Sequence, residues 1–360
     1  MTPSYPPHHG GLENLVAQLA LHLQGNDCEV TVVTQFRGAI PESQHHEVDL
    51  RGVKIHRFNT PIGGKRFGYS FQLTKWLRLH QIEFDVIHVF NYHAPVALAT
   101  VLRTRRKTVF SPTFHGDGHS TLARLLHIFY RPAARLIFHR ADRILCISEG
   151  ERRAVVEAFP FCASRTVCIQ LAPRDEIIRD NPKNTLAKPV ILIAGRLEPY
   201  KRIDLVIKSM PMLTMTADLI VCGSGPDRTR LEQLVFRLGL ENSVHLMGFV
   251  SDDDLSTWLA HAHVVVSMST KESYGFSVAE GIAAGANVIV SDIHAHQELI
   301  EPNDSSAKLV STRVTPQELA TYIDQSLTSP RQNFTSSRRR TWNDVAHEIH
   351  DLYRSLSDPK

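Results

Sequence analysis

Two successive runs of alternating strand-like and helix-like segments occupy most of this 360-residue sequence. In each run, short apolar segments of strand character are separated by longer stretches with helical periodicity. Parallel strands need such crossover segments, and the helices then cover both faces of the sheet. We therefore expect an α/β protein with doubly wound parallel sheets.

The first run has expected strands at 30–34, 53–58, 86–90, 108–111 and 143–147, and expected helices at 12–23, 71–80 and 95–104. The second run has expected strands at 189–194, 218–222, 244–247, 264–268 and 288–290, and an expected helix at 200–210. Between the runs, residues 173–189 are polar and irregular, which is typical of a linker. An amphipathic helix is expected at 342–356, near the end of the chain.

The composition is that of an ordinary globular protein, with 42% hydrophobic and 21% charged residues. No apolar run approaches the ~20 residues that a membrane-spanning helix needs. Tyr5-Pro6-Pro7 stands where a signal peptide would have its apolar region. The five cysteines are scattered and form no C-x-x-C pair, which argues against a disulfide framework and a zinc site. These features indicate a cytoplasmic protein.

The net charge of +3 conceals an asymmetry, because residues 1–180 carry +6 and the remainder carries −3. Residues 103–143 hold nine basic side chains against two acidic ones. Such a stretch suits an anionic membrane surface or an acidic acceptor, and equally an ordinary solvated helix. Peripheral association with the inner face of a membrane is therefore one of two open interpretations.

The stretch from Lys271 to Gly285 carries two carboxylates, Glu272 and Glu280, between two strand-like runs. Glu272 falls in the loop after a strand, at the edge where doubly wound sheets bind ligands. The backbone amides of Gly275, Phe276 and Ser277 begin a helix and would suit a phosphate. A carboxylate beside a phosphate site is useful where sugar hydroxyls need an acceptor, which gives Glu272 a reason to be there.

A structural interpretation competes at Glu280. Ser277 is a natural N-cap, and Ser277-Val-Ala-Glu280 has the spacing of a capping box, in which Glu280 in the first turn serves its own helix start. The sequence of this segment alone leaves both interpretations open.

Two cations mark the first strand end of the second run. Arg196 follows the strand at 189–194, and Lys201 opens the expected helix. Cations at a strand end and a helix start would hold a diphosphate. The next strand ends in Gly223-Ser-Gly-Pro, which lacks the third glycine of the dinucleotide fingerprint.

In the first run, Gly10-Gly11 precedes a helix and allows close backbone approach to a ligand. His115 lies in a glycine-bearing loop after a strand and is the candidate functional side chain there. No metal site is expected: residues 251–254 read as a helix N-terminus, and the His-Ala-His pairs at 261 and 294 lack a third ligand.

Taken together, the ordered fragments resemble the retaining GT-B glycosyltransferases of family 4. The fragments that carry the resemblance are Pro6-Pro7-x-x-Gly10-Gly11-x-Glu13, Gly195-Arg196-Leu197, Lys201-Arg-x-Asp204, Gly223-x-Gly225-Pro226, Gly248-Phe249-Val250 and Glu272…Glu280. The resemblance runs almost the full length of the chain.

This resemblance implies two Rossmann-like domains facing across a cleft, at residues 1–175 on the acceptor side and 186–335 on the nucleotide-sugar side. It also implies that the helix at 340–357 crosses back to pack on the first domain. Where relatives have a strand before the Pro-Pro-Gly-Gly loop, this chain has almost no residues. Where they have Pro-Asn-Gly before the linker, it has Ala172-Pro173.

The resemblance also implies a role for each candidate residue. Arg196 and Lys201 would hold the donor's diphosphate, and Glu280 would accept hydrogen bonds from the ribose. Glu272 and the backbone of Tyr274, Gly275 and Phe276 would face the transferred sugar and distal phosphate. The other expected contacts are Gly223, Phe249 and Val250 on the nucleotide side, and His115, Gly10 and Gly11 from the first domain.

The activity implied is the transfer of a hexose from a nucleotide-diphospho-sugar to a hydroxyl acceptor, a glycan or a lipid-linked molecule. No cofactor, metal or nucleic acid is implied. The alternatives are a non-catalytic nucleotide-sugar-binding protein or truncated inactive homologue, and an epimerase or phosphorylase on the same fold. A dehydrogenase is disfavoured, because G-x-G-x-x-G after a first strand is absent.

Overall fold

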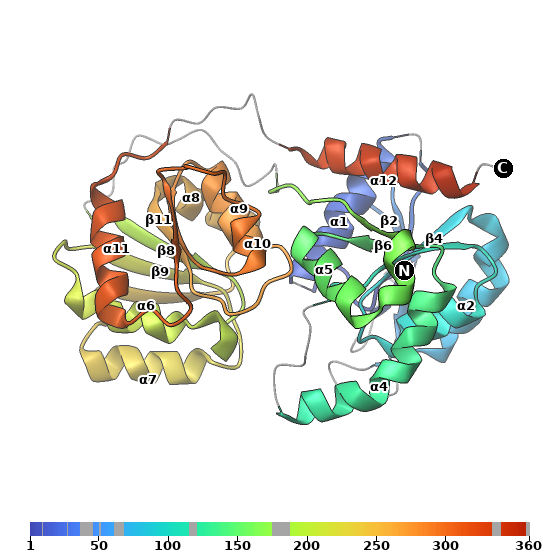
Figure 1. The fold of residues 1–360 in the computed structure, drawn as a ribbon, viewed down its shortest axis with the longest axis horizontal. Helices are drawn as coiled ribbons and strands as arrows, with labels where there is room; N and C mark the ends of the chain where they lie inside the picture. Colours follow the sequence, from blue (N-terminus) through green and yellow to red (C-terminus); the bar gives the residue numbers. More distant parts are fainter. Residues whose placement is uncertain are drawn as a thin grey trace. The chain divides into compact units, whose positions relative to one another are not determined.

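The computed structural model describes residues 1–8, 10–26, 28–36, 46–49, 52–60, 68–114, 121–174, 188–332 and 340–357, with the backbone alone for 121–129 and 131. The chain divides into two compact units: unit 1 contains residues 1–171 and 341–360, and unit 2 contains residues 172–340. Most of the expected linker and His115 lie outside the described residues. Figure 1 shows the helices and strands of both units.

Unit 1 contains β1 (Thr31–Phe36), β2 (His46–Val48), β3 (Lys54–Asn59), β4 (Val86–Phe90), β5 (Lys107–Ser111), β6 (Arg143–Cys146) and β7 (Thr166–Cys168). Its helices are α1 (Gly11–Gln24), α2 (Phe71–His80), α3 (Pro95–Arg103), α4 (Thr121–Arg140), α5 (Glu149–Ala158) and α12 (Trp342–Ser357). The strands form two ordered sheets, β1-β3-β2 and β4-β5-β6-β7. All neighbours pair in parallel except β2 with β3.

The first two residues of the chain lie between these two sheets. Thr2 pairs in parallel with Thr34 of β1 and donates its amide to Val33 O at 3.0 Å. On the other side, the amide of Phe90 in β4 donates to Met1 O at 3.1 Å. Met1 and Thr2 thus occupy the position in which a first strand would pair with both β1 and β4.

Helix α12 packs against α1 within unit 1, which is the crossing-back of the last helix expected from the sequence. Trp342, Val345 and Ile349 form its buried stripe. The Tyr353 hydroxyl lies 2.6 Å from Nδ1 of His88 in β4, so a polar contact fixes the far end of the helix.

Unit 2 contains β8 (Val190–Ala194), β9 (Asp218–Cys222), β10 (Val244–Gly248), β11 (Ala262–Ser267), β12 (Asn287–Ser291) and β13 (Ala307–Val310). Its helices are α6 (Ile203–Ser209), α7 (Arg228–Leu238), α8 (Asp252–His261), α9 (Phe276–Ala283), α10 (His294–Gln297) and α11 (Pro316–Thr328). The strands form one parallel sheet in the order β10-β9-β8-β11-β12-β13.

Alternate side chains of the central strands fill two cores, because successive residues of a strand point to opposite faces. In β8, Ile191 and Ile193 belong to the core under α6, α7 and α11. Val190 and Leu192 belong to the core under α8 and α9. The helices cover both faces of the sheet, as expected for a doubly wound fold (Figure 1).

Candidate functional site

The strand order of unit 2 contains a single reversal in direction among its described strands, between β8 and β11. The chain moves outward from β8 through β9 to β10 and then returns to add β11, β12 and β13 on the other side. Doubly wound sheets bind ligands outside the carboxyl ends of the strands at such a switch point. The loops after β8 and β11 therefore define where a ligand of unit 2 would bind.

A small, solvent-open hollow lies at this point. Its lining comes from the ends of β8 and β11, the loops that follow them and the start of α6, namely Ile193 to Arg196, Lys201, Ile203, Val206 and Val266 to Ser269. Both predicted diphosphate ligands, Arg196 and Lys201, are among these residues.

Lys201 ends a short 3-10 turn, Pro199–Lys201, rather than opening a helix. The predicted helix at 200–210 is wrong in its first turn, because Arg202 adopts a left-handed backbone (φ 52°) and α6 begins only at Ile203. The Lys201 ammonium donates to Oε1 of Glu272, and both side chains are largely buried. A bond from the Thr270 amide to Tyr200 O, 2.9 Å long, also joins the two loops.

Lys201 and Glu272 keep each other ionised. Burial alone would lower the pKa of Lys201, but the charge of Glu272 holds it above its usual value. Burial would conversely raise the pKa of Glu272, and the ammonium and hydrogen bond of Lys201 bring it below its usual value. A bound diphosphate would therefore meet a charged lysine that already has one carboxylate partner.

Arg196 is the more exposed of the two cations. Its side chain is about 60% exposed, and Nη2 lies 2.7 Å from Oε1 of Glu198. An exposed pair of this kind contributes little to stability, so the guanidinium can turn toward a ligand at small cost.

The strand-end loops of unit 2 are held together backbone to backbone. The amide of Gly195 donates to Cys222 O at 2.9 Å, and that of Gly223 donates to Gly248 O at 2.7 Å. Gly223 has φ 142°, and a Cβ atom there would overlap the carbonyl oxygen of Gly195. Only glycine allows this approach.

The predicted base-side residues follow directly on β10. Phe249 is exposed, and Val250 packs partly against the core under α8 and α9. Both lie at the same carboxyl edge of the sheet as Gly223.

Helix α9 begins one strand away from β8, and its start differs from the prediction. Its N-cap is Gly275, with φ 96° and no side-chain cap, so the Ser277 N-cap and the capping box are wrong. Glu280 consequently lies in the second turn. That the first amides of α9 bind a ligand at this edge stays a prediction. Tyr274 is buried just before the helix, with its ring 5.0 Å from that of Phe276.

Glu280 is buried and binds an arginine that the sequence did not single out. Its Oε1 accepts from Nε of Arg174 at 2.7 Å, and Nη1 of Arg174 donates to Oδ1 of Asp252 at 2.7 Å. The sequence signal was the departure after Ala172-Pro173, where this chain has an arginine.

His296 is a second residue at this edge that was not predicted as a site residue. Its His-Ala-His pair was considered from the sequence only as a metal site, which was rejected. It is fully buried, its Nδ1–H donates to Ser291 O at 2.9 Å, and burial lowers its pKa. It lies beside Gly275 and faces the charges of Glu272 and Lys201. Among the described residues no three His, Cys, Asp or Glu side chains gather to hold a metal, and metal independence stays a prediction.

The predicted residues of unit 1 are described separately. Gly11 is the first residue of α1, and Gly10 is its N-cap in extended backbone. A Cβ at Gly10 would overlap the carboxylate of Glu13, which therefore folds over this helix start. His115 falls outside the described residues, but the amide of its neighbour Phe114 donates to Glu151 at 2.6 Å.

The fold is that of GT-B glycosyltransferases. Sucrose-phosphate synthase from Thermosynechococcus elongatus superposes with a TM-score of 0.81 at 19% identity, over 98% of this chain and 95% of that one. The Anabaena protein HepE, solved with UDP and glucose, superposes with a TM-score of 0.78 at 20% identity, over 99% of each chain.

Two family models match successive parts of the sequence: Glycosyltransferase Family 4 over residues 9–171 and Glycosyl transferases group 1 over residues 174–343. The chain therefore belongs to the glycosyltransferases that these two models together describe.

Two curated relatives differ in the extent of their match. GDP-mannose:cellobiosyl-diphosphopolyprenol alpha-mannosyltransferase of Komagataeibacter xylinus is 23% identical over 98% of this chain and 91% of its own length. An uncharacterized glycosyltransferase of Methanocaldococcus jannaschii is 30% identical, over 46% of this chain and 44% of its own length.

Proposed function

We propose that this protein is a retaining glycosyltransferase that moves a hexose from a nucleotide-diphospho-sugar to a hydroxyl of a glycan or lipid-linked acceptor. The observation that carries the proposal is that Arg196 and Lys201 line one hollow at the switch point of unit 2. The relative from Komagataeibacter xylinus supports it, since its name specifies GDP-mannose as donor and a diphosphopolyprenol-linked acceptor.

In this proposal the cations of unit 2 stabilise the leaving group. The bond between the anomeric carbon and the diphosphate breaks while a bond to the acceptor oxygen forms on the same face. The acceptor's proton passes to the departing phosphate oxygen. Negative charge grows on the diphosphate during this step, and Lys201, Arg196 and the start of α9 would neutralise it.

The remaining contacts orient the donor. Glu272 and the backbone at Tyr274, Gly275 and Phe276 would face the sugar and the distal phosphate, and Glu280 would accept from the ribose. Gly223, Phe249 and Val250 would border the nucleotide. His115, Gly10 and Gly11 are the proposed contributions of unit 1.

The test starts with a thermal-shift screen of nucleotide sugars, with GDP-mannose and UDP-glucose first, followed by assays of nucleoside diphosphate release with lipid-linked and glycan acceptors. Lys201→Ala is expected to lower turnover by roughly 100-fold or more. Arg196→Ala, which leaves the buried Lys201–Glu272 pair intact, is expected to lower it by a smaller factor. Lys208→Ala removes a surface lysine of α6 paired with Asp204 and serves as the control.

Unchanged turnover in both Lys201→Ala and Arg196→Ala would contradict the proposed site. Donor binding without release of nucleoside diphosphate under any acceptor would instead favour a binding protein. Retention itself is checked by the NMR coupling constant of the anomeric proton in the product.

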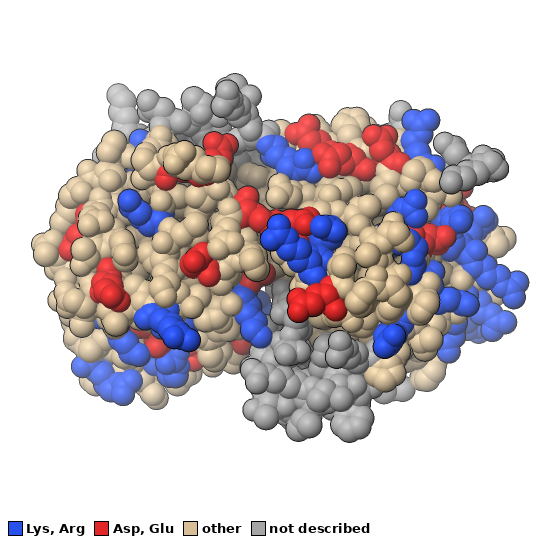
Figure 2. Space-filling model, in the orientation of Figure 1, with Lys and Arg blue, Asp and Glu red and all other residues tan. Residues whose placement is uncertain are grey.

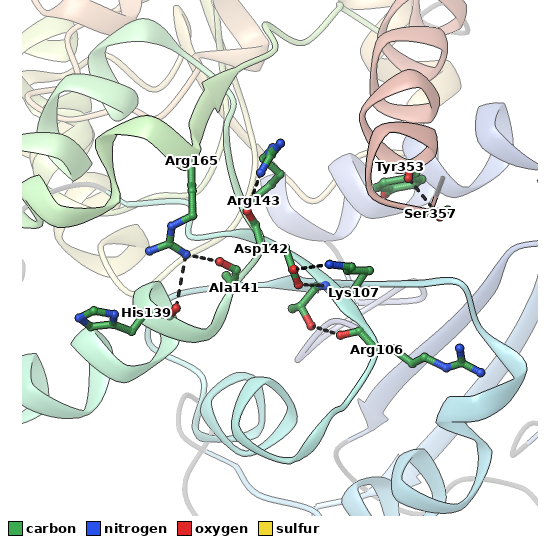
Figure 3. A network of polar contacts seen from close by, with 10 residues as sticks. Arg106, Lys107, His139, Ala141, Asp142, Arg143, Arg165, Tyr353 and Ser357 are labelled. Atoms are coloured by element: carbon green, nitrogen blue, oxygen red, sulfur yellow. Dashed lines mark hydrogen bonds and ion pairs between the residues drawn. The ribbon is translucent and has the colours of Figure 1, made fainter. Parts of the chain in front are cut away.

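We further propose peripheral attachment of unit 1 to anionic membranes. No described helix is both long enough and apolar enough to span a bilayer. Part of the basic stretch is engaged within the fold: Figure 3 shows Arg143 and Lys107 directed to the turn at Ala141 and Asp142, which Arg165 also contacts from outside the stretch. These cations act structurally.

A second group of residues, which includes Arg103 and Arg105 of the basic stretch, combines exposed charge with exposed apolar groups. We call it the α2 face: Arg78, Leu79, Ile82, Arg103 and Arg105. Leu79 is 64% and Ile82 72% exposed. The Arg105 amide donates to Gln81 Oε1 at 2.8 Å, which holds the two segments together. In Figure 2 Lys and Arg side chains gather at the end of unit 1 that holds α2.

Exposed apolar side chains ringed by arginines suit the headgroup region of an anionic bilayer. Co-sedimentation with phosphatidylglycerol vesicles is expected to exceed that with phosphatidylcholine vesicles and to fall at high salt. Arg103→Glu with Arg105→Glu should abolish the difference, whereas Arg237→Glu on α7 should not. Equal binding to both lipids would contradict the attachment.

A further inference from the structure

Arg174 links three parts of unit 2. It lies at the start of the unit, only 6% exposed, and contacts Glu280 on α9 and Asp252 at the start of α8. Both contacts are 2.7 Å long. The Glu280 side chain is 2% exposed, so the Arg174–Glu280 pair is buried, whereas the Asp252 side chain is 74% exposed.

The contact with Glu280 leaves half of the carboxylate available. Nε of Arg174 binds Oε1, and Oε2 of Glu280 accepts no hydrogen bond from the residues that the structure describes. Nη1 of Arg174 is directed to Asp252, which fixes the plane of the guanidinium. Because the guanidinium is planar, this also fixes the direction of Nε toward Oε1.

The charge of Arg174 matters as much as its position. Burial raises the pKa of Glu280, Arg174 opposes that rise, and Asp252 adds to it, so that the pKa lies above its usual value. Tyr274 is the other titratable group whose interaction with Glu280 is evident. Without Arg174 the pKa of Glu280 would rise further, which disfavours the ionised form that accepts a charge-assisted hydrogen bond.

We propose that Arg174 is a positioning residue for the donor's ribose, which holds one oxygen of Glu280 and leaves the other to accept from the ribose hydroxyls. This inference rests on the proposed function, in which Glu280 contacts the ribose. Arg174 acts only through Glu280 and touches neither the sugar nor the diphosphate.

The inference is tested by calorimetric binding of GDP and UDP to the full chain between pH 6 and pH 9, using whichever nucleotide the unsubstituted protein binds. Arg174→Met is expected to weaken binding roughly 10- to 100-fold near pH 7. Affinity should recover in part as the pH rises and Glu280 ionises. Arg174→Lys should restore part of the affinity, because it returns the charge without the planar contact.

A double-mutant cycle separates action through Glu280 from direct contact. Glu280→Gln should weaken binding without the pH dependence, and adding Arg174→Met to it should weaken binding no further. The double variant also leaves no unpaired buried charge. If Arg174→Met alone does not fold, the comparison of Glu280→Gln with the double variant still tests the inference. Arg230→Met is the matched control, because Arg230 pairs with Asp227 and Asp204 on the surface of the same unit.

A second probe is the 2′,3′-dideoxy analogue of the bound nucleotide. The unsubstituted protein should bind it weakly, and Arg174→Met should not weaken it further. Equal losses for both nucleotides, or an added loss in the Glu280→Gln background, would show direct contact and overturn the inference. Unchanged affinity in Arg174→Met would overturn it too, whereas failure of the unsubstituted protein to bind any nucleoside diphosphate would contradict the proposed function itself.

Discussion

The two units hold their strand-end loops in different ways. In unit 2, the loops after β8, β9 and β10 are joined by backbone hydrogen bonds that require Gly223. In unit 1, the loops after β5 and β6 are joined by one buried carboxylate: Glu151 accepts from the amides of Phe114 at 2.6 Å and Ile147 at 2.8 Å.

The two arrangements differ in whether an ionisable group holds the loops together. The backbone bonds that join the loops of unit 2 involve no ionisable group, so they do not depend on pH. A carboxylate between two amides makes the edge of unit 1 sensitive to protons. Burial raises the pKa of Glu151 to about 7, and the two amide bonds limit the rise.

The largest expected effect is at Gly223. Gly223→Ala combines a strained backbone with overlap on Gly195, and should lower the free energy of unfolding by roughly 3–5 kcal/mol. Gly239→Ala is the matched control, since Gly239 has φ 66° but nothing within 4 Å of a Cβ, and it should cost only about 1–2 kcal/mol. Urea unfolding measures both. Equal losses of unfolding free energy in the two variants would show that the close approach of Gly223 to the Gly195 carbonyl is unimportant.

The next effect is a pH dependence specific to unit 1. The folded state keeps a proton on Glu151 up to about pH 7, whereas the unfolded chain loses it near the usual glutamate pKa of 4.5. The folded state binds more protons in this window, so stability falls as pH rises through it, by up to roughly 3 kcal/mol. Glu151→Gln should abolish this fall, and equal pH profiles of the two proteins in urea unfolding would contradict the assignment.

The smallest effect concerns the helix that carries Glu151. Ser148 caps α5 by accepting from the Glu151 amide at 3.1 Å, and Ser251 caps α8 in unit 2 by accepting from the Asp254 amide at 3.1 Å. Each Ser→Ala change should cost about 1 kcal/mol. Ser148→Ala should cost more, because the same turn positions the buried carboxylate. A larger loss at Ser251 would contradict the structural role assigned to Glu151.

The buried strands were the most predictable part of the fold. The expected ranges 86–90 and 218–222 coincide with β4 and β9, because their apolar residues report burial directly. The strands β2, β7 and β13 were not predicted. They are three or four residues long, and in β13 the side chains of Lys308 and Leu309 are exposed, so no apolar run marks it.

Local backbone conformation and distant pairing account for the errors at the site. Arg202 and Gly275 adopt positive φ, which shifted the starts of α6 and α9 away from the predicted residues. Arg196 was placed correctly after a strand, because that placement follows from the alternation of elements, whereas Lys201 ends a 3-10 turn and does not open a helix. Arg174 was missed because Glu280 lies 106 positions away, and no local sequence pattern predicts a contact between residues so far apart.

The return of α12 to unit 1 has a consequence for how the polypeptide matures. Residues 172–340, a compact unit in their own right, are synthesised before the helix that covers α1. Since domains generally fold as they leave the ribosome, unit 2 can fold before unit 1 is complete. Unit 1 is completed only after α12 has been synthesised, and until then the surface that receives Trp342 stays exposed to water.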